Sequence, residues 1–316
     1  MRLDARSGVQ PLFMSSGDLL VDRRYQWALE YLAGGDRAAA ADILQQVVAA
    51  APAFAAAWFA LGEIREARGE RGGAVAAFRA ARDADPHDLH GARLRLARLG
   101  EGEATPELMQ AHVRRVFDQH APHFEESLLR HLDYRGPQLL AATVGAVTRA
   151  AARPGRFASM LDLGCGTGLA GAAFRARVDR LTGVDISAAM IEAARRKGLY
   201  DRLETGELLA FLAAEAAAQR QYDLVIAADV LVYVENLGAV ADAVRGVLTP
   251  RGLFAFTVET HAGEGVLLRE SLRYAHGAAC VRAAVAGLDL VHLAEVATRT
   301  ERGQAVPGLL AIACAC

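Results

Sequence analysis

An acidic residue and three glycines lie close together near the middle of the chain, in a pattern that can bind a nucleotide-like ligand. The run at 160–168, M-L-D-L-G-C-G-T-G, reads as a buried strand that ends in Asp162 and a glycine-rich turn. Gly164, Gly166 and Gly168 let the backbone turn tightly and approach a ligand, which a Cβ would obstruct. The helix expected next would direct its free N–H groups toward that ligand.

The charge of Asp162 separates two possible ligands. Gly166, Gly168 and Gly171 also have the G-x-G-x-x-G spacing of a dinucleotide site. A pyrophosphate would meet the Asp162 carboxylate, whereas S-adenosylmethionine has no phosphate and carries an ammonium and a sulfonium. A second acid, Asp185, ends the next short apolar strand about twenty residues later, where ribose hydroxyls are expected. The pattern therefore favours S-adenosylmethionine as the cofactor.

The sequence L-D-L-G-C-G-T-G followed by G-V-D-I-S resembles that of class I S-adenosylmethionine-dependent methyltransferases. The resemblance implies an α/β fold with a Rossmann-like, seven-stranded sheet whose last two strands add an antiparallel edge. Ile186 would pack on adenine. Glu207 stands where the family, more commonly with Asp, contacts the adenine amine, and a solvated surface role is an equal alternative. The cofactor-binding candidates are Asp162, Gly164, Gly166, Gly168, Asp185, Ile186, Glu207 and Phe117.

Strand and helix patterns alternate from residue 158 onward, which is typical of a parallel, doubly wound sheet. Helices are expected over 107–150, where apolar residues recur at three-to-four spacing, and a helical insert is expected near 264–285. The expected strands are 158–163, 180–185, 222–228, 252–258, 289–300 and 309–316.

The first third of the chain repeats itself with the 34-residue period of tetratricopeptide repeats, as Pro52 and Pro86 or Leu44 and Phe78 illustrate. We therefore expect a small all-α domain of two repeats and a capping helix ahead of the catalytic domain. The predicted boundaries are an unpatterned leader at 1–16, repeats at 17–100, a linker at 101–106 and the methyltransferase domain at 107–316.

Methyl transfer is an in-line displacement, so the enzyme mainly positions the acceptor and, where needed, removes its proton. Asp229 ends an apolar strand and is the first catalytic candidate, with capping of the following helix as the alternative. Tyr233 could line the same pocket or be an ordinary half-buried tyrosine. His276 is a candidate general base, with a structural histidine as the alternative, and His261 is a weaker candidate of the same kind.

Further candidates belong to the acceptor pocket. Arg273 and Tyr274 could orient an acidic or polar acceptor. Phe117 and Phe124 resemble an entry helix that related enzymes fold over the cofactor, although helix core is an equal alternative. We therefore predict Arg273, Tyr274 and Phe124 as substrate-binding residues.

Composition narrows the class of partner. The chain has 316 residues, a formal net charge of -2 and four cysteines. Neither a basic face for nucleic acid or membrane nor a zinc or disulfide pattern is evident. The N-P-P-Y type sequence of resembling DNA-methylating enzymes is absent at 229–233. We expect a cytoplasmic protein with no metal, no membrane span and no nucleic-acid partner.

Three functions remain open from the sequence. The first is a methyltransferase acting on oxygen, nitrogen or sulfur of a small molecule. The second is a protein or peptide methyltransferase whose repeats hold the substrate. The third is a non-catalytic scaffold that senses the donor. The order of the motifs resembles a bacterial group of predicted repeat-containing methyltransferases, for which the acceptor stays open.

Overall fold

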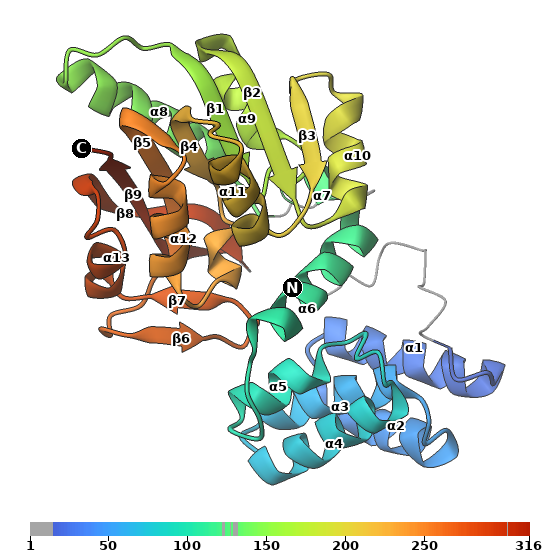
Figure 1. Cartoon of the computed structure of the whole chain (residues 1–316). Coiled ribbons are helices and arrows are strands. Elements are labelled where there is room, and N and C mark those ends of the chain that lie inside the picture. The colour runs from blue at the N-terminus through green and yellow to red at the C-terminus, as the bar shows by residue number, and fades with distance from the viewer. Residues whose placement is uncertain (1–14, 122–123, 127, 129–131, 302) are drawn as a thin grey trace. The chain divides into compact units, whose positions relative to one another are not determined.

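The chain folds into two units (Figure 1). They comprise Met1–His112 with Glu270–Leu272, and Val113–Arg269 with Arg273–Cys316. The boundary lies inside helix α6 (Pro106–His120), shortly after the predicted linker. The computed structural model describes residues 15–121, 124–126, 128, 132–301 and 303–316.

The N-terminal unit is helical, as the sequence predicts. Its elements are α1 (Leu19–Ala33), α2 (Arg37–Ala50), α3 (Ala55–Ala67), α4 (Arg71–Ala84) and α5 (Ala92–Arg98). Helix α1 begins after Asp18, whose carboxylate accepts hydrogen bonds from the backbone N–H groups of Leu20 and Val21. Gly62 is required for packing, because a Cβ there would lie 2.6 Å from the Phe78 ring on α4. The assignment of these helices as tetratricopeptide repeats stays a prediction.

The second unit is built on one mixed sheet. Strands β1 (Phe157–Leu163), β2 (Val178–Asp185), β3 (Arg202–Thr205), β4 (Tyr222–Ala227) and β5 (Leu248–Glu259) run parallel in the order β3-β2-β1-β4-β5. Strand β9 (Gln304–Cys314) pairs antiparallel with β5, and β8 (Asp289–Glu301) pairs antiparallel with β9. The parallel sheet and its antiparallel edge are thus confirmed, and β3 is a strand that the sequence pattern did not predict.

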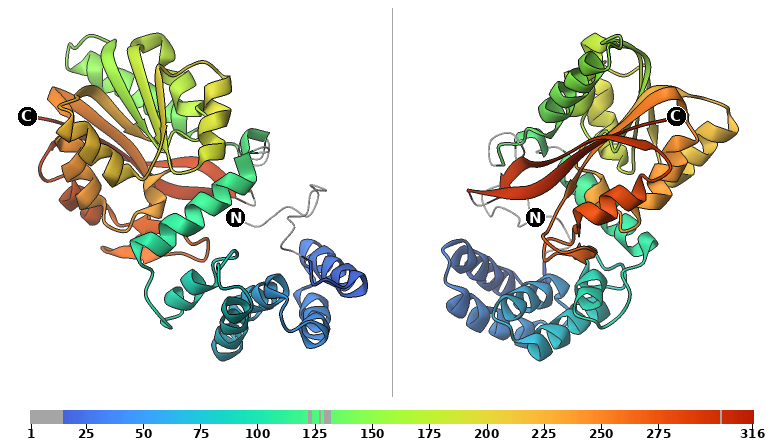
Figure 2. Two further views of the ribbon diagram at one scale, coloured as in Figure 1. Left: turned by 45° about the vertical axis from the view of Figure 1, so that its right-hand side comes forward. Right: turned by 90° about the vertical axis from the view of Figure 1, so that its left-hand side faces the viewer.

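Helices cover both faces of this sheet (Figure 2). Leu161 of β1 packs in the cluster that contains α11 (Leu208–Ala217), α12 (Leu237–Arg245) and α13 (Ala278–Ala284). Its neighbour Met160 packs in the cluster with α8 (Gly136–Ala150) and α9 (Leu169–Phe174). This alternation follows from the period of two in a strand, and it explains why the central strands are apolar on both faces. The remaining helices are α7 (Phe124–Glu126), α10 (Ala188–Arg196) and the short 3-10 turns Arg175–Arg177 and Leu231–Tyr233.

The expected helical insert near 264–285 is wrong for its first half. Strands β6 (Val266–Leu268) and β7 (Tyr274–His276) form an antiparallel hairpin there, and only α13 is helical. Strand β7 also pairs with the end of β5 through Glu259 and Ala275. Pairing with an available sheet edge therefore overrides the local helical spacing. In the described residues the sheet has nine strands instead of the predicted seven.

None of the helices in the described part of the chain has the length and apolar character needed to cross a membrane.

Candidate functional site

The glycine-rich turn after β1 requires glycine for its backbone geometry. Gly164, Gly166 and Gly168 have φ angles of 65°, 53° and 91°, in the left-handed region that L side chains rarely adopt. At Gly164 space is also lacking, since a Cβ would lie 2.6 Å from the Cβ of Val230. Helix α9 begins at Leu169, directly after the turn, where the sequence predicts a helix. Of the three glycines, only Gly166 has room beside its Cα for a further group.

Asp162 lies buried on β1 just before this turn, with 1% of its surface exposed. The Tyr200 hydroxyl donates a 2.6 Å hydrogen bond to its Oδ2. Its Oδ1 atom is also buried and has no hydrogen-bond partner among the described residues. Burial raises the pKa of this carboxyl to about 7, against the opposing effects of the Tyr200 hydrogen bond and, to a smaller extent, of the Gly171 backbone N–H. An unpartnered buried carboxylate oxygen is costly, so this atom is suited to a cationic ligand group.

Asp185 holds the glycine turn against the end of β2. Its Oδ2 accepts a 2.8 Å hydrogen bond from the Gly166 N–H, and its Oδ1 accepts a 2.9 Å bond from the Ser187 N–H. Burial raises the pKa of Asp185 to about 6, although these backbone hydrogen bonds oppose the increase. Ser187 in turn caps α10 and donates to Asp118 on α6, with a distance of 2.6 Å between the oxygens. The two acids predicted for the cofactor therefore lie on neighbouring strands beside one turn.

The two predicted adenine contacts lie near the end of β2. Ile186 is half-buried and directly follows Asp185. The Gly206 N–H donates to the Asp185 carbonyl over 2.9 Å, which brings the turn before α11 next to β2. Glu207 in this turn accepts a 2.8 Å hydrogen bond from the Ala210 N–H and caps α11. Its role toward adenine stays a prediction.

Three predicted aromatic residues meet near the glycine turn. The Phe117 ring on α6 makes edge-on contacts with Phe124 and Tyr233, with centroid distances of 5.6 and 5.7 Å. A Cβ at Gly166 would lie 3.8 Å from the Phe124 ring, so this aromatic cluster borders the turn. The structure thus brings together residues separated by more than 100 positions in the sequence.

Asp229 follows β4 with a left-handed φ of 54°, which is rare for a residue other than glycine. Its Oδ1 accepts a 2.7 Å hydrogen bond from the Thr257 hydroxyl. Its Oδ2 accepts bonds from the Thr298 hydroxyl and from Arg299, at 2.8 and 3.1 Å. Both oxygens are therefore already engaged by the protein, unlike those of Asp162. A role of Asp229 as general base stays a prediction that these contacts do not favour.

Arg299 connects Asp229 to a buried network of charges. Its guanidinium also pairs with Glu259 and Glu301. Arg273 pairs with the same two acids, and the Nε–carboxylate distance to Glu259 is 2.7 Å. Both arginines and Glu259 are almost completely buried. The predicted substrate residue Arg273 is thus part of an ion-pair network that reaches Asp229.

Tyr274 and His276 lie on β7 and are buried in the core of the unit. The His276 Nε2 atom is 3.2 Å from the Glu235 carbonyl, and its ring is fully enclosed. Burial lowers the pKa of His276. These surroundings favour the structural alternative for His276, and its role as a general base stays a prediction.

Several residues around the site were not predicted from the sequence. Tyr200, Thr257, Thr298 and Arg299 contact the predicted acids through loops and strands distant in sequence. Tyr134 is a further buried neighbour, since Asp229, Arg299 and Asp162 all affect its pKa, which burial raises. The sequence offered one signal for these residues: Arg299 is a charged residue inside a predicted strand, which indicates a buried partner of opposite charge.

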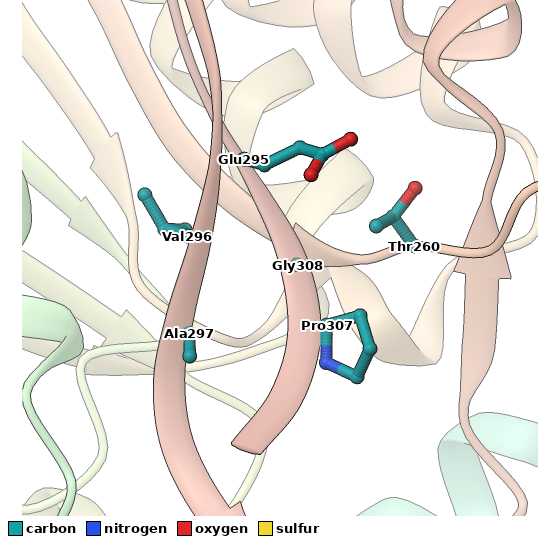
Figure 3. A pocket seen from close by; sticks show the side chains of 6 residues that line it. All are labelled: Thr260, Glu295, Val296, Ala297, Pro307 and Gly308. Atoms are coloured by element: carbon teal, nitrogen blue, oxygen red, sulfur yellow. The ribbon is translucent and has the colours of Figure 1, made fainter.

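A small hollow lies at the β8–β9 edge of the sheet and differs from this site (Figure 3). It has a volume of about 240 Å³ and contains none of the predicted site residues. The Glu295 carboxylate and Thr260 extend into the same space, and the Thr260 hydroxyl donates to the His276 carbonyl. The hollow is lined by Thr260, Glu295, Val296, Ala297, Pro307 and Gly308.

No group of three metal-ligating side chains is present in the described ranges. The four cysteines are free thiols.

Comparison with known proteins identifies the central part of the second unit. Residues 161–254 match a family of proteins described as "Methyltransferase domain". The chain is 38% identical over 108 residues to methyltransferase-like protein 27 of Homo sapiens, covering 34% of this chain and 42% of that protein. It is 30% identical over 145 residues to malonyl-[acyl-carrier protein] O-methyltransferase of Enterobacter lignolyticus, covering 46% and 52%. The chain spans about half the length of the curated relatives it matches.

Solved methyltransferase structures are also similar to this chain. One is magnesium protoporphyrin IX methyltransferase from Synechocystis PCC 6803 with bound S-adenosylhomocysteine. It has a TM-score of 0.49 and 19% identity, and the match covers 66% of this chain and 100% of that chain. The family match shows that residues 161–254 belong to a methyltransferase domain, and both curated relatives are methyltransferases.

Proposed function

We propose, from the methyltransferase domain in its second unit, that this protein transfers a methyl group from S-adenosylmethionine to oxygen, nitrogen or sulfur of a small molecule. The observation that carries the proposal is the buried Oδ1 of Asp162, which has no partner among the described residues. Burial of an unpaired carboxylate costs free energy unless a ligand supplies the missing charge. The ammonium of the methyl donor has the required charge.

The residues around Asp162 fit the other parts of the donor. We propose that the methionyl part lies beside Gly166, where a Cβ would come no closer than 3.8 Å to the Phe124 ring, and that Asp185 accepts hydrogen bonds from the ribose hydroxyls. A carboxylate oxygen can accept more than one hydrogen bond, so its bonds to Gly166 and Ser187 do not exclude a ligand. Ile186 and Glu207 are the residues proposed for adenine, and Phe117 would cover the pocket.

The bound donor supplies a methyl group that its positive sulfur already activates for displacement. The task of the chain is therefore to orient the acceptor and to exclude water. Phe117, Phe124 and Tyr233 form an apolar border beside the glycine turn. The Tyr233 hydroxyl interacts with Arg273, and burial raises the pKa of Tyr233, so it is a hydrogen-bond donor at neutral pH. We propose that Tyr233 and Arg273 orient a polar acceptor.

Asp229 would support this arrangement without removing a proton, because Thr257, Thr298 and Arg299 already engage its oxygens. An acceptor that loses its proton readily, such as a carboxylic acid or a thiol, requires no strong base. The name of one curated relative specifies an O-methyltransferase, which agrees with an oxygen acceptor.

For the N-terminal unit we propose two tetratricopeptide-like repeats, α1 with α2 and α3 with α4, followed by the capping helix α5. The 34-residue spacing in the sequence and the contact of Gly62 with Phe78 support this assignment. A groove of such repeats would bind a protein or peptide partner.

Calorimetric titration of the full chain with S-adenosylmethionine and S-adenosylhomocysteine tests the proposal, with NAD as the control ligand. We expect both sulfur nucleosides to bind, and Asp162→Ala and Asp185→Ala each to weaken binding about 10-fold or more, since each removes a contact to a charged group. Tight binding of NAD with no response to the sulfur nucleosides would refute the proposal.

A further inference from the structure

Tyr200 lies in the connection between α10 and β3 and reaches under the glycine turn. Its hydroxyl donates the 2.6 Å hydrogen bond to Oδ2 of Asp162 described above. Tyr200 is partly buried, and burial raises the pKa of its hydroxyl well above the usual value. The hydroxyl therefore stays protonated and acts as a donor at neutral pH.

Three glycines from different elements make room for the Tyr200 ring. A Cβ at Gly171 on α9 would lie 2.5 Å from Cζ of Tyr200, and one at Gly183 on β2 would lie 2.7 Å from Cε1. A Cβ at Gly168 in the turn would approach Cε2 to 3.0 Å. Any side chain at Gly171 or Gly183 would thus displace the ring.

The backbone conformations distinguish these glycines. Gly168 has a φ of 91° and needs glycine for its conformation as well. Gly171 and Gly183 lie outside the left-handed region, so their backbone could accept other residues. Space for Tyr200 is therefore the physical reason for glycine at both positions. This also explains Gly171, whose G-x-G-x-x-G spacing with Gly166 and Gly168 resembles a dinucleotide site.

We infer that Tyr200 is a positioning residue for the amino-acid end of the methyl donor: it binds Oδ2 of Asp162 and leaves Oδ1 directed to the donor's ammonium. This inference rests on the proposed function. The hydroxyl fixes the rotation of the carboxylate, which would otherwise be free to turn in its pocket. Tyr200 itself need not touch the ligand.

The other ionisable groups near Asp162 are Asp185, Cys165 and Tyr134, whose interactions with it are electrostatic. Asp185 raises the pKa of Asp162, whereas the Tyr200 hydrogen bond and the Gly171 backbone N–H lower it. Loss of the hydroxyl would therefore raise that pKa further. An ammonium needs the ionised carboxylate, so binding of the donor would then be lost at a higher pH than in the wild type.

Two ligands separate positioning from general damage. S-adenosylhomocysteine has the amino-acid end, and 5′-methylthioadenosine has the same adenine, ribose and thioether without it. In titrations of the full chain, Tyr200→Phe should weaken binding of S-adenosylhomocysteine about 10-fold at pH 7 and change that of methylthioadenosine less than 2-fold. On acidification, the Tyr200→Phe variant should also lose binding of S-adenosylhomocysteine at a higher pH than the wild type does. Combined with Asp162→Asn, it should cause no additional loss.

Gly171→Ala provides a second variant, because it displaces the Tyr200 ring while keeping the hydroxyl. It should show the same selective loss, and it keeps the test decisive if Tyr200→Phe does not fold. Equal weakening of both ligands, unchanged binding of both, or independent effects of Tyr200→Phe and Asp162→Asn would overturn the inference. If the wild type binds neither nucleoside, the proposed function fails first and the inference fails with it.

Discussion

Buried acids follow neighbouring strands of one sheet in two different ways. At β1 and β2, Asp162 and Asp185 have no arginine or lysine ion-pair partner among the described residues, and burial raises the pKa of both. Beyond β4 and at the end of β5, Asp229 and Glu259 are bound by Arg299. The first two acids therefore lack a cationic partner among the described residues, whereas arginine neutralises the second two.

This difference teaches where a ligand is needed. Both pairs are acids at the carboxyl ends of parallel strands, where ligands of such sheets bind. Of these four acids, only Asp162 has a buried oxygen without a hydrogen-bond partner among the described residues, which a cationic ligand would satisfy. The paired acids instead hold β4, β5 and β8 together beside the proposed acceptor pocket. The partner of an acid is therefore more informative about function than the acid's position on its strand.

Removal of Arg299 should have the largest effect on this comparison. Arg299→Leu leaves Asp229 and Glu259 buried without their shared cation, so the free energy of unfolding should fall by about 3–5 kcal/mol. Urea unfolding of the full chain measures it. Arg195→Leu is the control, because Arg195 forms an exposed pair with Glu192 and its loss should cost less than about 0.5 kcal/mol. A similar small loss for both variants would show that the network is not a structural unit.

Asp162→Asn tests the unpaired acid through pH. The protonated carboxyl of Asp162 contributes stability that is fully present below its unfolded pKa near 3.8 and is lost as pH rises through about 7. The variant has no charge to bury, so relative to wild type it should gain on the order of 1–3 kcal/mol between pH 4.5 and pH 8 without ligand. Unfolding by urea at several pH values measures this gain.

The exposed Asp242 provides the control for that experiment. Asp242→Asn should change stability by the same small amount at every pH. S-adenosylhomocysteine should stabilise the wild type more than Asp162→Asn at pH 7.5, because the ligand supplies the missing cation. If the difference in the free energy of unfolding between wild type and Asp162→Asn did not change with pH, burial would not raise the pKa of Asp162.

The proposed donor side of the site could be predicted from the sequence because its residues are close together in the chain. The spacing of Asp162, Gly164, Gly166 and Gly168 specifies a strand and a tight turn, and the structure has both. Tyr200 could not be predicted this way, since its contact with Asp162 depends on the space that distant glycines leave. Local patterns predict backbone geometry, whereas such packing is a property of the folded chain.

The proposed acceptor side was harder to predict because its residues come from segments that are distant in the sequence. Asp229 was correctly placed at the end of an apolar strand, but its partner Arg299 lies 70 residues away. The hairpin of β6 and β7 depends on an edge of β5, which no local pattern reveals. Arg273 thus lies in the connection between β6 and β7, directly before β7, and not within a helix. To predict an ion pair across a sheet, the register of every strand between the two residues must be known.

The smallest expected effect concerns two helix caps, one near the unpaired acids and one near the paired acids. Glu207 caps α11 beside β2, and Asn236 caps α12 beyond β4. Each should lose about 1 kcal/mol of stability on replacement by alanine, because one backbone N–H loses its acceptor. Only Glu207→Ala should also weaken nucleoside binding, by about 5-fold if the carboxylate accepts a hydrogen bond from adenine. Thermal unfolding and titration measure the two effects separately.

The pattern across ligands distinguishes Glu207 from Tyr200. Adenine is present in both S-adenosylhomocysteine and methylthioadenosine, so Glu207→Ala should weaken both equally, whereas Tyr200→Phe should affect only the first. Asn236→Ala should change neither affinity, since Asn236 accepts a hydrogen bond from the Ala239 N–H and caps α12, which follows β4. If Glu207→Ala lowers stability and leaves both affinities unchanged, Glu207 is a helix cap alone. Recognition of adenine would then depend on Ile186 and on backbone groups at the end of β2.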